Sequence, residues 1–425
     1  MSHATFLHRQ ALYLRPDPAR VIVRPFKPAT EPRDLNPTDK TRANHIVERV
    51  LALDPKVAAG LLADVLENFQ GRHRNLLETF EARADVMEQA LAAHGAFSSV
   101  QRQLIGAYFL NEYSFEASAL FNPSIVPHPD QSEAPKGGLR FILSLRAVGE
   151  GHVSSLTFRA GTIAADGSLT VDPTARLASS PRVKLRVPKP DGDEIELTFN
   201  PDEELSERVI FPVTDSQSNG IEDARFVEFS DDGRKTYYAT YTAYSGKAIR
   251  SELIETSDFL SFRMSPLQGT AARNKGMALF PRRIDGKYAM IARQDNENLY
   301  LIYSDDLYRW DGGRAILKPQ FPGNSCRSET AVHPSNSMKA GSCSRTASVR
   351  SGNIRSARPC STRTIPPGCW RVRLNRCCIP SRLSAKATFP TWSIPAGRCG
   401  TTTRSFCPMP FLTPIPTLRP SRLQP

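Results

Sequence analysis

Two different spacings of apolar residues divide the chain between residues 41 and 322. Up to about residue 119 the apolar residues recur at three- and four-residue steps, a spacing typical of amphipathic helices. From about residue 120 they alternate with polar residues in short runs that are broken by Gly, Asp, Asn and Pro, which indicates β-strands. The pattern therefore predicts a helical extension over 41–119 and a β-rich region over 120–322.

Helix signals within 41–119 place three helices. Asp54-Pro55 is an N-cap followed by Pro at the first helical position, and the helix that it starts carries Val57, Leu61, Val65 and Phe69 on one face. A second helix follows Gly71, and Ser98 with Gln101 forms a capping box for a third. Residues 1–40 are rich in Pro and charge, so we expect an extended arm with one strand-like run at 20–26.

The most informative stretch of the β-rich region is 220–244. It opens with Gly-Ile-Glu-Asp-Ala-Arg at 220–225, continues as an apolar run to Phe229, turns at Ser230-Asp-Asp-Gly233 and returns as a Tyr- and Thr-rich run over 236–244. An Asp-Gly turn between two such runs predicts a β-hairpin.

A repeat of about 50 residues runs through this region. The segment from Asp223 to Phe262 compares with the segment from Met277 to Trp310, with an offset of 54 at Phe226 and 53 at Gly233. Short antiparallel strands that repeat at this period are the signature of a β-propeller. A β-sandwich would share the strand content but would not require the repeat.

Candidate chemistry recurs once in each predicted blade, near its opening. A carboxylate pair among several basic residues suggests an anionic ligand, such as phosphate or sulfate, beside an acid. The alternatives are a structural salt bridge that closes a strand end at Asp223, and internal ion pairs at Arg146 and Lys275. The candidates are Asn122, Arg140 and Arg146 in one blade, Glu222, Asp223 and Arg225 in the next, and Asn274, Lys275 and Arg293 in the third.

Composition divides the chain near residue 323. The formal net charge is +12, but residues 330–425 hold 13 Arg and 2 Lys and no acid, so residues 1–329 are slightly acidic. All eight Cys lie at position 326 or later. Absence of Cys from the first 325 residues, together with the lack of a signal peptide or a long apolar run, favours a cytoplasmic protein with no membrane partner.

The segment 323–425 has no apolar period and no charge balance. A disordered basic arm for nucleic acid would lack its scattered Cys and Trp, and its Cys spacing does not match a zinc site. Codons can be chosen for two parts of this segment so that the reading frame one nucleotide away encodes a sequence with balanced charge. In that frame, apolar and polar residues alternate as they do in β-strands. We therefore interpret 323–425 as a disordered tail translated in a shifted reading frame after Pro322, with neither metal nor nucleic acid as a partner.

Five segments, taken together, resemble glycoside hydrolase family 130, the β-mannoside phosphorylases and β-1,2-mannosidases. The resemblance runs in order over about 20–322 and implies a five-bladed β-propeller, incomplete here if the frame breaks at 323. The segments are Asn122–His128, Arg140–Ala147, Gly220–Arg225, Tyr241–Tyr244 and Lys275–Arg282.

The resemblance implies phosphorolysis of β-mannosides with inversion to α-mannose 1-phosphate. Asp223 takes the position of the family's general acid, which acts through a sugar hydroxyl. It implies no cofactor, with inorganic phosphate as co-substrate, a β-mannoside oligosaccharide as the other partner, and a homo-oligomer as one option. Substrate-binding positions fall at Asn122, Arg140, Glu222, Arg225 and Tyr244, and phosphate-facing positions at Arg146, Lys275 and Arg293.

Three alternatives stay open. One carboxyl cluster among several basic residues favours a phosphorylase, because phosphate is already an anionic nucleophile, whereas inverting hydrolysis needs a second carboxylate to activate water. A β-1,2-mannosidase of the same family is nevertheless possible on the same motifs. The chain could also be a glycan-binding propeller or an inactive, truncated product.

Overall fold

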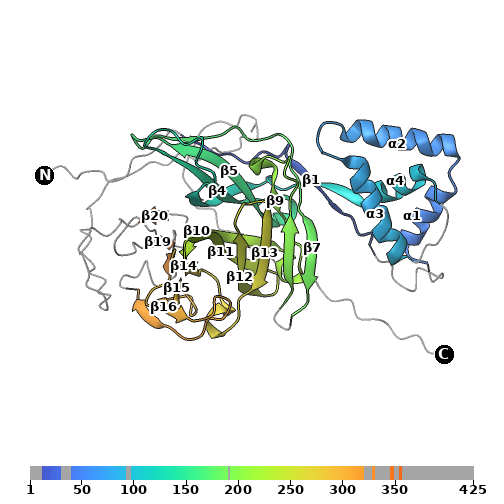
Figure 1. Ribbon diagram of the computed structural model, residues 1–425. Coiled ribbons are helices and arrows are strands. Elements are labelled where there is room, and N and C mark those ends of the chain that lie inside the picture. The colour runs from blue at the N-terminus through green and yellow to red at the C-terminus, as the bar shows by residue number, and fades with distance from the viewer. Residues whose placement is uncertain are drawn as a thin grey trace, which may run out of the picture. The chain divides into compact units, whose positions relative to one another are not determined.

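The computed structural model describes residues 12–29, 40–91, 97–189 and 192–319, and the backbone of three short strands between residues 328 and 356 (Figure 1). The predicted strand-like run at 20–26 is confirmed as β1 (Val21–Pro25), which pairs antiparallel with β2 (Leu110–Ser114). The last residues of the predicted helical extension thus form a strand that returns alongside the arm.

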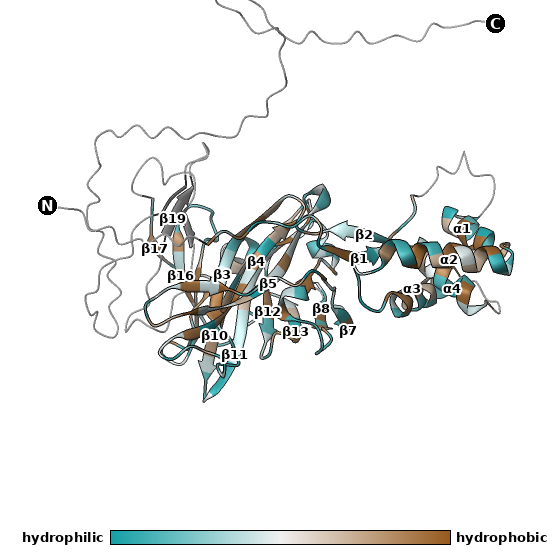
Figure 2. Cartoon of the chain, turned by 90° about the horizontal axis from the view of Figure 1, so that it is seen from above, coloured by the Kyte–Doolittle hydropathy of each residue, from teal (hydrophilic) through white to brown (hydrophobic). Residues whose placement is uncertain are grey.

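Four helices lie between these two strands: α1 (Arg42–Leu51), α2 (Pro55–Phe69), α3 (Leu76–Ala90) and α4 (Ser99–Tyr108). The predicted caps are confirmed. The Asp54 side chain accepts from the Lys56 amide at 2.8 Å, and Ser98 and Gln101 form a reciprocal capping box. Brown and teal bands alternate along the helices in Figure 2, as expected of amphipathic helices.

The predicted apolar face of α2 is confirmed in part, since Leu61 and Val65 pack against the helical core, but the most buried residues lie one position further along. Val57 is 51% exposed, whereas Ala58 and Leu62 are buried. Steps of four residues advance by more than one helical turn, so a row at strict four-residue spacing drifts around the helix and cannot fix the buried face. Helix α1 was not predicted at all, although Thr41 and Asn44 form a capping box at its start.

The strands that follow form one 11-stranded sheet and one four-stranded sheet. The larger sheet contains two antiparallel groups of four strands joined by one parallel residue pair, so the three four-stranded groups are called here sheets one, two and three. Their strands follow one another in sequence, so each sheet is a meander. Sheet one comprises β3 (Ala119–Pro127), β4 (Leu139–Val148), β5 (Ser154–Ile163) and β6 (Leu169–Val171). Sheet two comprises β10 (Gly220–Asp231), β11 (Arg234–Tyr244), β12 (Ile249–Thr256) and β13 (Ser261–Pro266). Sheet three comprises β14 (Ala278–Leu279), β15 (Tyr288–Ala292), β16 (Leu299–Ser304) and β17 (Arg314–Leu317).

Two short additions connect these sheets. The hairpin of β7 (Arg182–Val187) and β8 (Glu194–Thr198) extends sheet two beyond β13, and β9 (Val209–Ile210) pairs with β5. Sheets one and two also meet through a short parallel contact in which Gly220 pairs with Ser154. A side chain on Gly220 would place its Cβ 2.9 Å from the Ser154 nitrogen, so this close approach requires glycine.

The 50-residue repeat corresponds to sheets two and three. The predicted hairpin is confirmed as β10 and β11, with Asp232 and Gly233 both at positive φ, which is the geometry of a type I′ turn. Asp285 and Gly286 adopt the same conformation at the equivalent turn of sheet three.

Apolar side chains fill the space between neighbouring sheets. Phe158 of sheet one packs against Phe226, Phe259 and Phe262, with ring centroids 5.7–6.0 Å apart. A second cluster joins sheets two and three around Trp310, whose indole donates to the Leu307 carbonyl at 2.7 Å. The described residues are therefore mostly β with a helical extension; they contain three blade-like sheets and no closed ring, so the five-bladed propeller stays a prediction.

Three short strands fall within the predicted disordered tail: β18 (Ser328–Thr330), β19 (Arg345–Ser348) and β20 (Ile354–Ser356). They form one antiparallel sheet, so the expectation of a disordered tail is wrong over these strands. The remainder of 323–425, including all eight Cys, lies outside the described residues.

Candidate active site

Asp223 lies in a β-bulge of β10. Glu222 pairs with Thr242 and Arg225 pairs with Thr240, so Asp223 and Ala224 together oppose one residue of β11. Asp223 has a φ of 53°, in the left-handed region that residues other than glycine rarely adopt. A conformation of this kind is costly and concentrates at functional sites, which makes the bulge a candidate.

Asn122 occupies the same place in sheet one. It lies in a bulge of β3 between Phe121 and Ser124, and its φ is 52°. The two bulges face each other, because the Asn122 Nδ2 donates a hydrogen bond to the Asp223 Oδ1. Neighbouring sheets thus present one short polar side chain each to the same point.

Arg146 of β4 joins both carboxylates. Its Nη1 donates to the Asp223 Oδ1 at 3.1 Å, and its Nη2 donates to the Glu222 Oε1 at 2.7 Å. The guanidinium is held by the Ser154 hydroxyl at 2.9 Å and lies 5.1 Å from the ring centroid of Phe121. Lys275 approaches the other oxygen of Glu222 at 3.7 Å. The internal ion pairs considered for Arg146 and Lys275 are therefore present.

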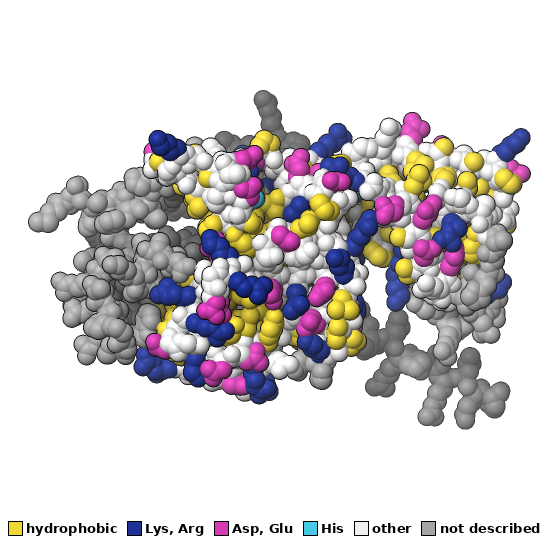
Figure 3. Space-filling model, in the orientation of Figure 1, with side chains coloured by type: hydrophobic (Ala, Val, Ile, Leu, Met, Phe, Trp, Pro, Cys, Tyr) yellow, Lys and Arg dark blue, Asp and Glu magenta, His cyan; other side chains and the backbone are white. Residues whose placement is uncertain are grey.

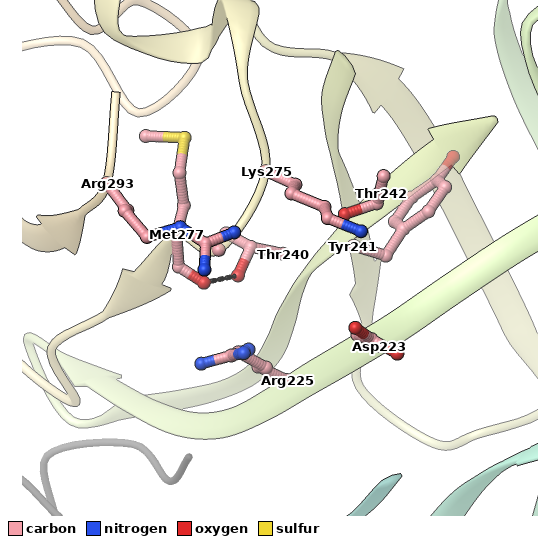
Figure 4. Close-up of a pocket in the computed structure, with 9 residues that line it drawn as sticks. Asp223, Arg225, Thr240, Tyr241, Thr242, Lys275, Met277 and Arg293 are labelled. Atoms are coloured by element: carbon pink, nitrogen blue, oxygen red, sulfur yellow. Dashed lines mark hydrogen bonds between the residues drawn. The ribbon is translucent and has the colours of Figure 1, made fainter. Parts of the chain in front are cut away.

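A small pocket beside this cluster gathers residues from sheets two and three (Figure 4). Three of its side chains are cationic and come from different segments: Arg225 from β10, Lys275 before β14, and Arg293 after β15. The open volume is about 10 Å³, room for about one water, so a larger anion would need these side chains to withdraw. The lining residues are Asp223, Arg225, Thr240, Tyr241, Thr242, Lys275, Gly276, Met277 and Arg293.

Short hydrogen bonds hold the sheet-three side of the pocket. The Thr240 hydroxyl donates to the Met277 carbonyl at 2.6 Å, as the dashed line in Figure 4 shows. The Ser251 hydroxyl donates to the Asn274 carbonyl at 2.5 Å, and the Asn274 Oδ1 accepts from the Lys275 amide at 2.8 Å. The segment that carries Lys275 is therefore fixed to β11 and β12.

Two predicted site residues lie away from this cluster. Arg140 is six residues before Arg146 on β4, which places it roughly 20 Å along the strand. Its guanidinium pairs with the Asp172 carboxylate at 2.7 Å, and this contact raises the pKa of Arg140. Tyr244 ends β11, and its hydroxyl donates to the Gly246 carbonyl at 3.4 Å. The structure does not bring either residue to Asp223.

A buried network behind the pocket was not predicted. Tyr241 donates from its hydroxyl to Glu252 on β12, and Gln217 donates to the same hydroxyl at 2.8 Å. Burial, and then the nearby Glu252 carboxylate, raises the pKa of Tyr241 well above its usual value. Glu252 also accepts from Ser216 and Arg250, each at 2.8 Å. The sequence carries no clear signal for this network, because Glu252 lies in a strand that also contains Arg250, Ser251 and Glu255.

Among the residues that the structure describes, no group of three His, Cys, Asp or Glu side chains is arranged to hold a metal ion. None of the helices in that part of the chain is long and apolar enough to cross a membrane. On the face seen in Figure 3, basic and acidic side chains are interspersed.

Comparison with known proteins identifies the segment that holds this site. Residues 196–336 match the sequence profile of a glycoside hydrolase family 130 group described as beta-1,4-mannooligosaccharide phosphorylase. This segment, about a third of the chain, is similar to glycoside hydrolase family 130. The matched residues include Asp223, Tyr241 and the three cationic side chains of the pocket. This family of mannoside phosphorylases also contains glycoside hydrolases.

Two curated relatives agree with this family. The chain is 30% identical over 115 residues to a beta-1,2-mannobiose phosphorylase of Listeria innocua, which covers 25% of this chain and 30% of the relative. It is 30% identical over 118 residues to a 1,2-beta-oligomannan phosphorylase of a Thermoanaerobacter species, covering 27% and 38%. The matches therefore span about a third of the length of these relatives.

A solved structure of beta-1,2-mannobiose phosphorylase from Listeria innocua, in complex with beta-1,2-mannobiose, is also similar. It is 16% identical, with a TM-score of 0.37, over 57% of this chain and 71% of that one.

Proposed function

We propose that residues 120–319 carry the site of a β-mannoside phosphorylase, with Asp223 as its general acid. The observation that carries the proposal is the pocket in which Asp223 lies with Arg225, Lys275 and Arg293, inside the segment that matches the family. An acid beside a group of cations suits a reaction in which an anion is the nucleophile.

The proposed reaction breaks one bond and forms one. A phosphate oxygen attacks the anomeric carbon of a β-mannoside from the face opposite the leaving group, and the glycosidic C–O bond breaks. The leaving oxygen takes a proton that originates on Asp223 and passes through a sugar hydroxyl. The products are α-mannose 1-phosphate and the shortened sugar, so the reaction needs no cofactor.

The positions of the side chains around Asp223 suggest a role for each of them. Arg225, Lys275 and Arg293 would hold phosphate, since Arg and Lys donate to its oxygens and neutralise its charge. Because the pocket now has room for about one water, phosphate must draw the flexible Arg225 and Lys275 aside as it enters. Asn122 and Arg146, which both donate to Asp223, would orient its carboxyl toward the sugar.

Hydrolysis by a β-1,2-mannosidase is the second candidate. It would need a second carboxylate free to activate water, and Glu222 is the nearest. One oxygen of Glu222 accepts from Arg146, and the other lies 3.7 Å from Lys275, so its carboxylate is committed to cations. This arrangement favours phosphorolysis.

We further propose that the three sheets are blades of a five-bladed propeller whose remaining blades are encoded in another reading frame after Pro322. In that case the chain as printed is inactive, and restoring the frame restores activity. Sequencing the gene across the codon for Pro322 tests this. An uninterrupted frame that is shared by close relatives would contradict it.

The test of the function is the phosphate dependence of mannoside cleavage. A chain with the frame restored is incubated with β-1,4-mannobiose or β-1,2-mannobiose, with and without inorganic phosphate, and the sugars are separated and quantified. We expect cleavage only when phosphate is present. Release of free mannose at full rate in phosphate-free buffer would identify a hydrolase instead.

A further inference from the structure

A second, larger cavity lies between sheets one and two, away from the pocket beside Asp223. Its volume is about 410 Å³, within the range of about 300–1,000 Å³ that is usual for small-molecule sites. The two sites share none of their lining residues. The larger one is lined by Pro127, His128, Pro129, Gln131, Leu139, Glu228, Lys235, Tyr237 and Ser257.

The separation follows from the path of β10. Glu228 lies five residues after Asp223 on this strand, which corresponds to roughly 15 Å. The cavity is therefore at the hairpin end of β10 and β11, whereas Asp223 is near the start of β10. A ligand in the cavity would not touch the reacting groups.

One ion pair marks the sheet-two wall. The Glu228 Oε1 lies 3.1 Å from the Lys235 Nζ, and its Oε2 accepts from the Tyr237 hydroxyl at 3.5 Å. The Glu228 side chain is 15% exposed and the Lys235 side chain is 65% exposed. Because the Glu228 carboxylate and the Lys235 ammonium neutralise each other, this wall favours neither an anionic nor a cationic ligand. The carboxylate can still accept hydrogen bonds from a ligand, and the ammonium can still donate them.

The opposite wall is formed by the loop after β3. His128 is fixed through its Nδ1, which lies 2.8 Å from the Asp130 carbonyl and 3.0 Å from the Asp130 amide. In either tautomer its Nε2 can donate to or accept from a hydroxyl group. Gln131 ties this loop to β4, since its side chain donates to the carbonyls of His128 and Arg140 at 2.6 and 2.8 Å.

Most of the remaining lining is apolar. Pro127, Pro129 and Leu139 offer hydrocarbon surface beside the polar groups, and Ser257 adds an exposed hydroxyl. Hydrocarbon surface beside neutral or compensated hydrogen-bonding groups suits a ligand with hydroxyl groups on its edges and C–H groups on its faces. That is the chemistry of a sugar.

We propose that this cavity is a second carbohydrate site, which binds a short oligosaccharide away from the reacting centre. The choice of a mannose-based oligosaccharide as ligand rests on the proposed function, but the site itself does not. With sugar bound at both the active site and this cavity, a longer oligosaccharide, or a second oligosaccharide, would stay bound to the enzyme between turnovers.

Binding of β-1,4-mannotetraose to the chain as printed tests the proposal, by saturation-transfer NMR and isothermal titration. The variants are Ser257→Trp, which fills the cavity, and Glu228→Gln, which keeps the size of the side chain. We expect Ser257→Trp to abolish binding and Glu228→Gln to weaken it by about tenfold, the effect of one hydrogen bond to a charged group. Ser261→Trp, at an exposed position that lines neither site, should bind as the parent does.

The outcomes separate this inference from the proposed function. Binding that Ser257→Trp removes and Ser261→Trp leaves intact supports the second site, even if the enzyme later shows no phosphorolysis. Binding that survives both Ser257→Trp and Glu228→Gln would overturn it, and so would the absence of any binding by the parent chain. Circular dichroism of each variant, compared with the exposed control Ser261→Trp, identifies a variant that has failed to fold.

Discussion

Tyr241 provides the sharpest test of how the bulge at Asp223 is supported. It stands on β11 directly opposite Asp223 and Ala224, and its hydroxyl donates to the buried carboxylate of Glu252. Tyr241→Phe removes this donor and keeps the ring. The Glu252 Oε2 would then accept only from Gln217, at 3.1 Å.

The expected cost follows from burial. Tyr241 is 3% exposed and Glu252 is 2% exposed, so water cannot replace the lost donor. A hydrogen bond to a charged group contributes about 1.5–3 kcal/mol to the free energy of unfolding. At about 2–4 °C per kcal/mol for a domain of 150–250 residues, Tm should fall by roughly 3–12 °C.

Thermal and urea unfolding, followed by circular dichroism, measure this change. Tyr244→Phe is the matched control, since its hydroxyl makes only a 3.4 Å contact with the Gly246 carbonyl, and its Tm should stay near that of the parent. Equal Tm values for Tyr241→Phe and Tyr244→Phe would refute the reasoning.

The contribution of Tyr241 to stability depends on pH. The folded-state pKa of Tyr241 is raised by burial and by Glu252, so its contribution to stability is fully present below the ordinary tyrosine pKa of about 10 and is lost as pH rises above it. The stability difference between the parent and Tyr241→Phe should therefore be constant from about pH 7 to 9 and shrink above about pH 10.

Two further predictions concern stability. Gly220→Ala should lower the free energy of unfolding by about 3 kcal/mol or more, because a φ of 145° is strained for alanine and the new Cβ would clash with Ser154. Gly233→Ala, in open space at a φ of 77°, should lower it by only about 1–2 kcal/mol. Equal urea midpoints for the two variants would contradict this prediction. Partial burial of Asp295 is outweighed by hydrogen bonds from Asn298, Tyr300 and Glu297, which lower the pKa of Asp295 to about 2. The contribution of its ionised carboxylate to the stability of the fold is therefore present above about pH 4 and is lost toward pH 2. Asp295→Asn should accordingly be less stable than the parent at pH 5 in urea unfolding, and a gap that fails to narrow at pH 2.5 would refute this.

The hairpin and the repeat could be predicted from the sequence because they depend on residues that are close together in the chain. An Asp-Gly pair sets the turn at 232–233, and its counterpart at 285–286 recurs with the same backbone. Asp54 and Ser98 likewise start their helices with their own side chains. Such features depend on neighbours in sequence and can be predicted from it.

Contacts between distant segments could not be predicted in the same way. Arg140 and Arg146 share a strand and a motif, but the strand carries them to different ends of sheet one, and the partner of Arg140 is Asp172, 32 residues later. The buried face of α2 is set by the helices around it. Tyr241 and Glu252 meet only because β11 and β12 pair in one register.

The role of Asp223 is tested most directly by the rate at which α-mannose 1-phosphate forms. The frame-restored chain, its Asp223→Asn variant and a control, Asp231→Asn, which alters a carboxylate paired with Arg283 at the far end of β10, are supplied with mannobiose and phosphate and followed by ³¹P NMR. We predict that Asp223→Asn lowers the rate by about 10²–10⁴-fold, the contribution of general acid catalysis, while Asp231→Asn remains near the parent. Equal rates for Asp223→Asn and Asp231→Asn would show that the acid lies elsewhere.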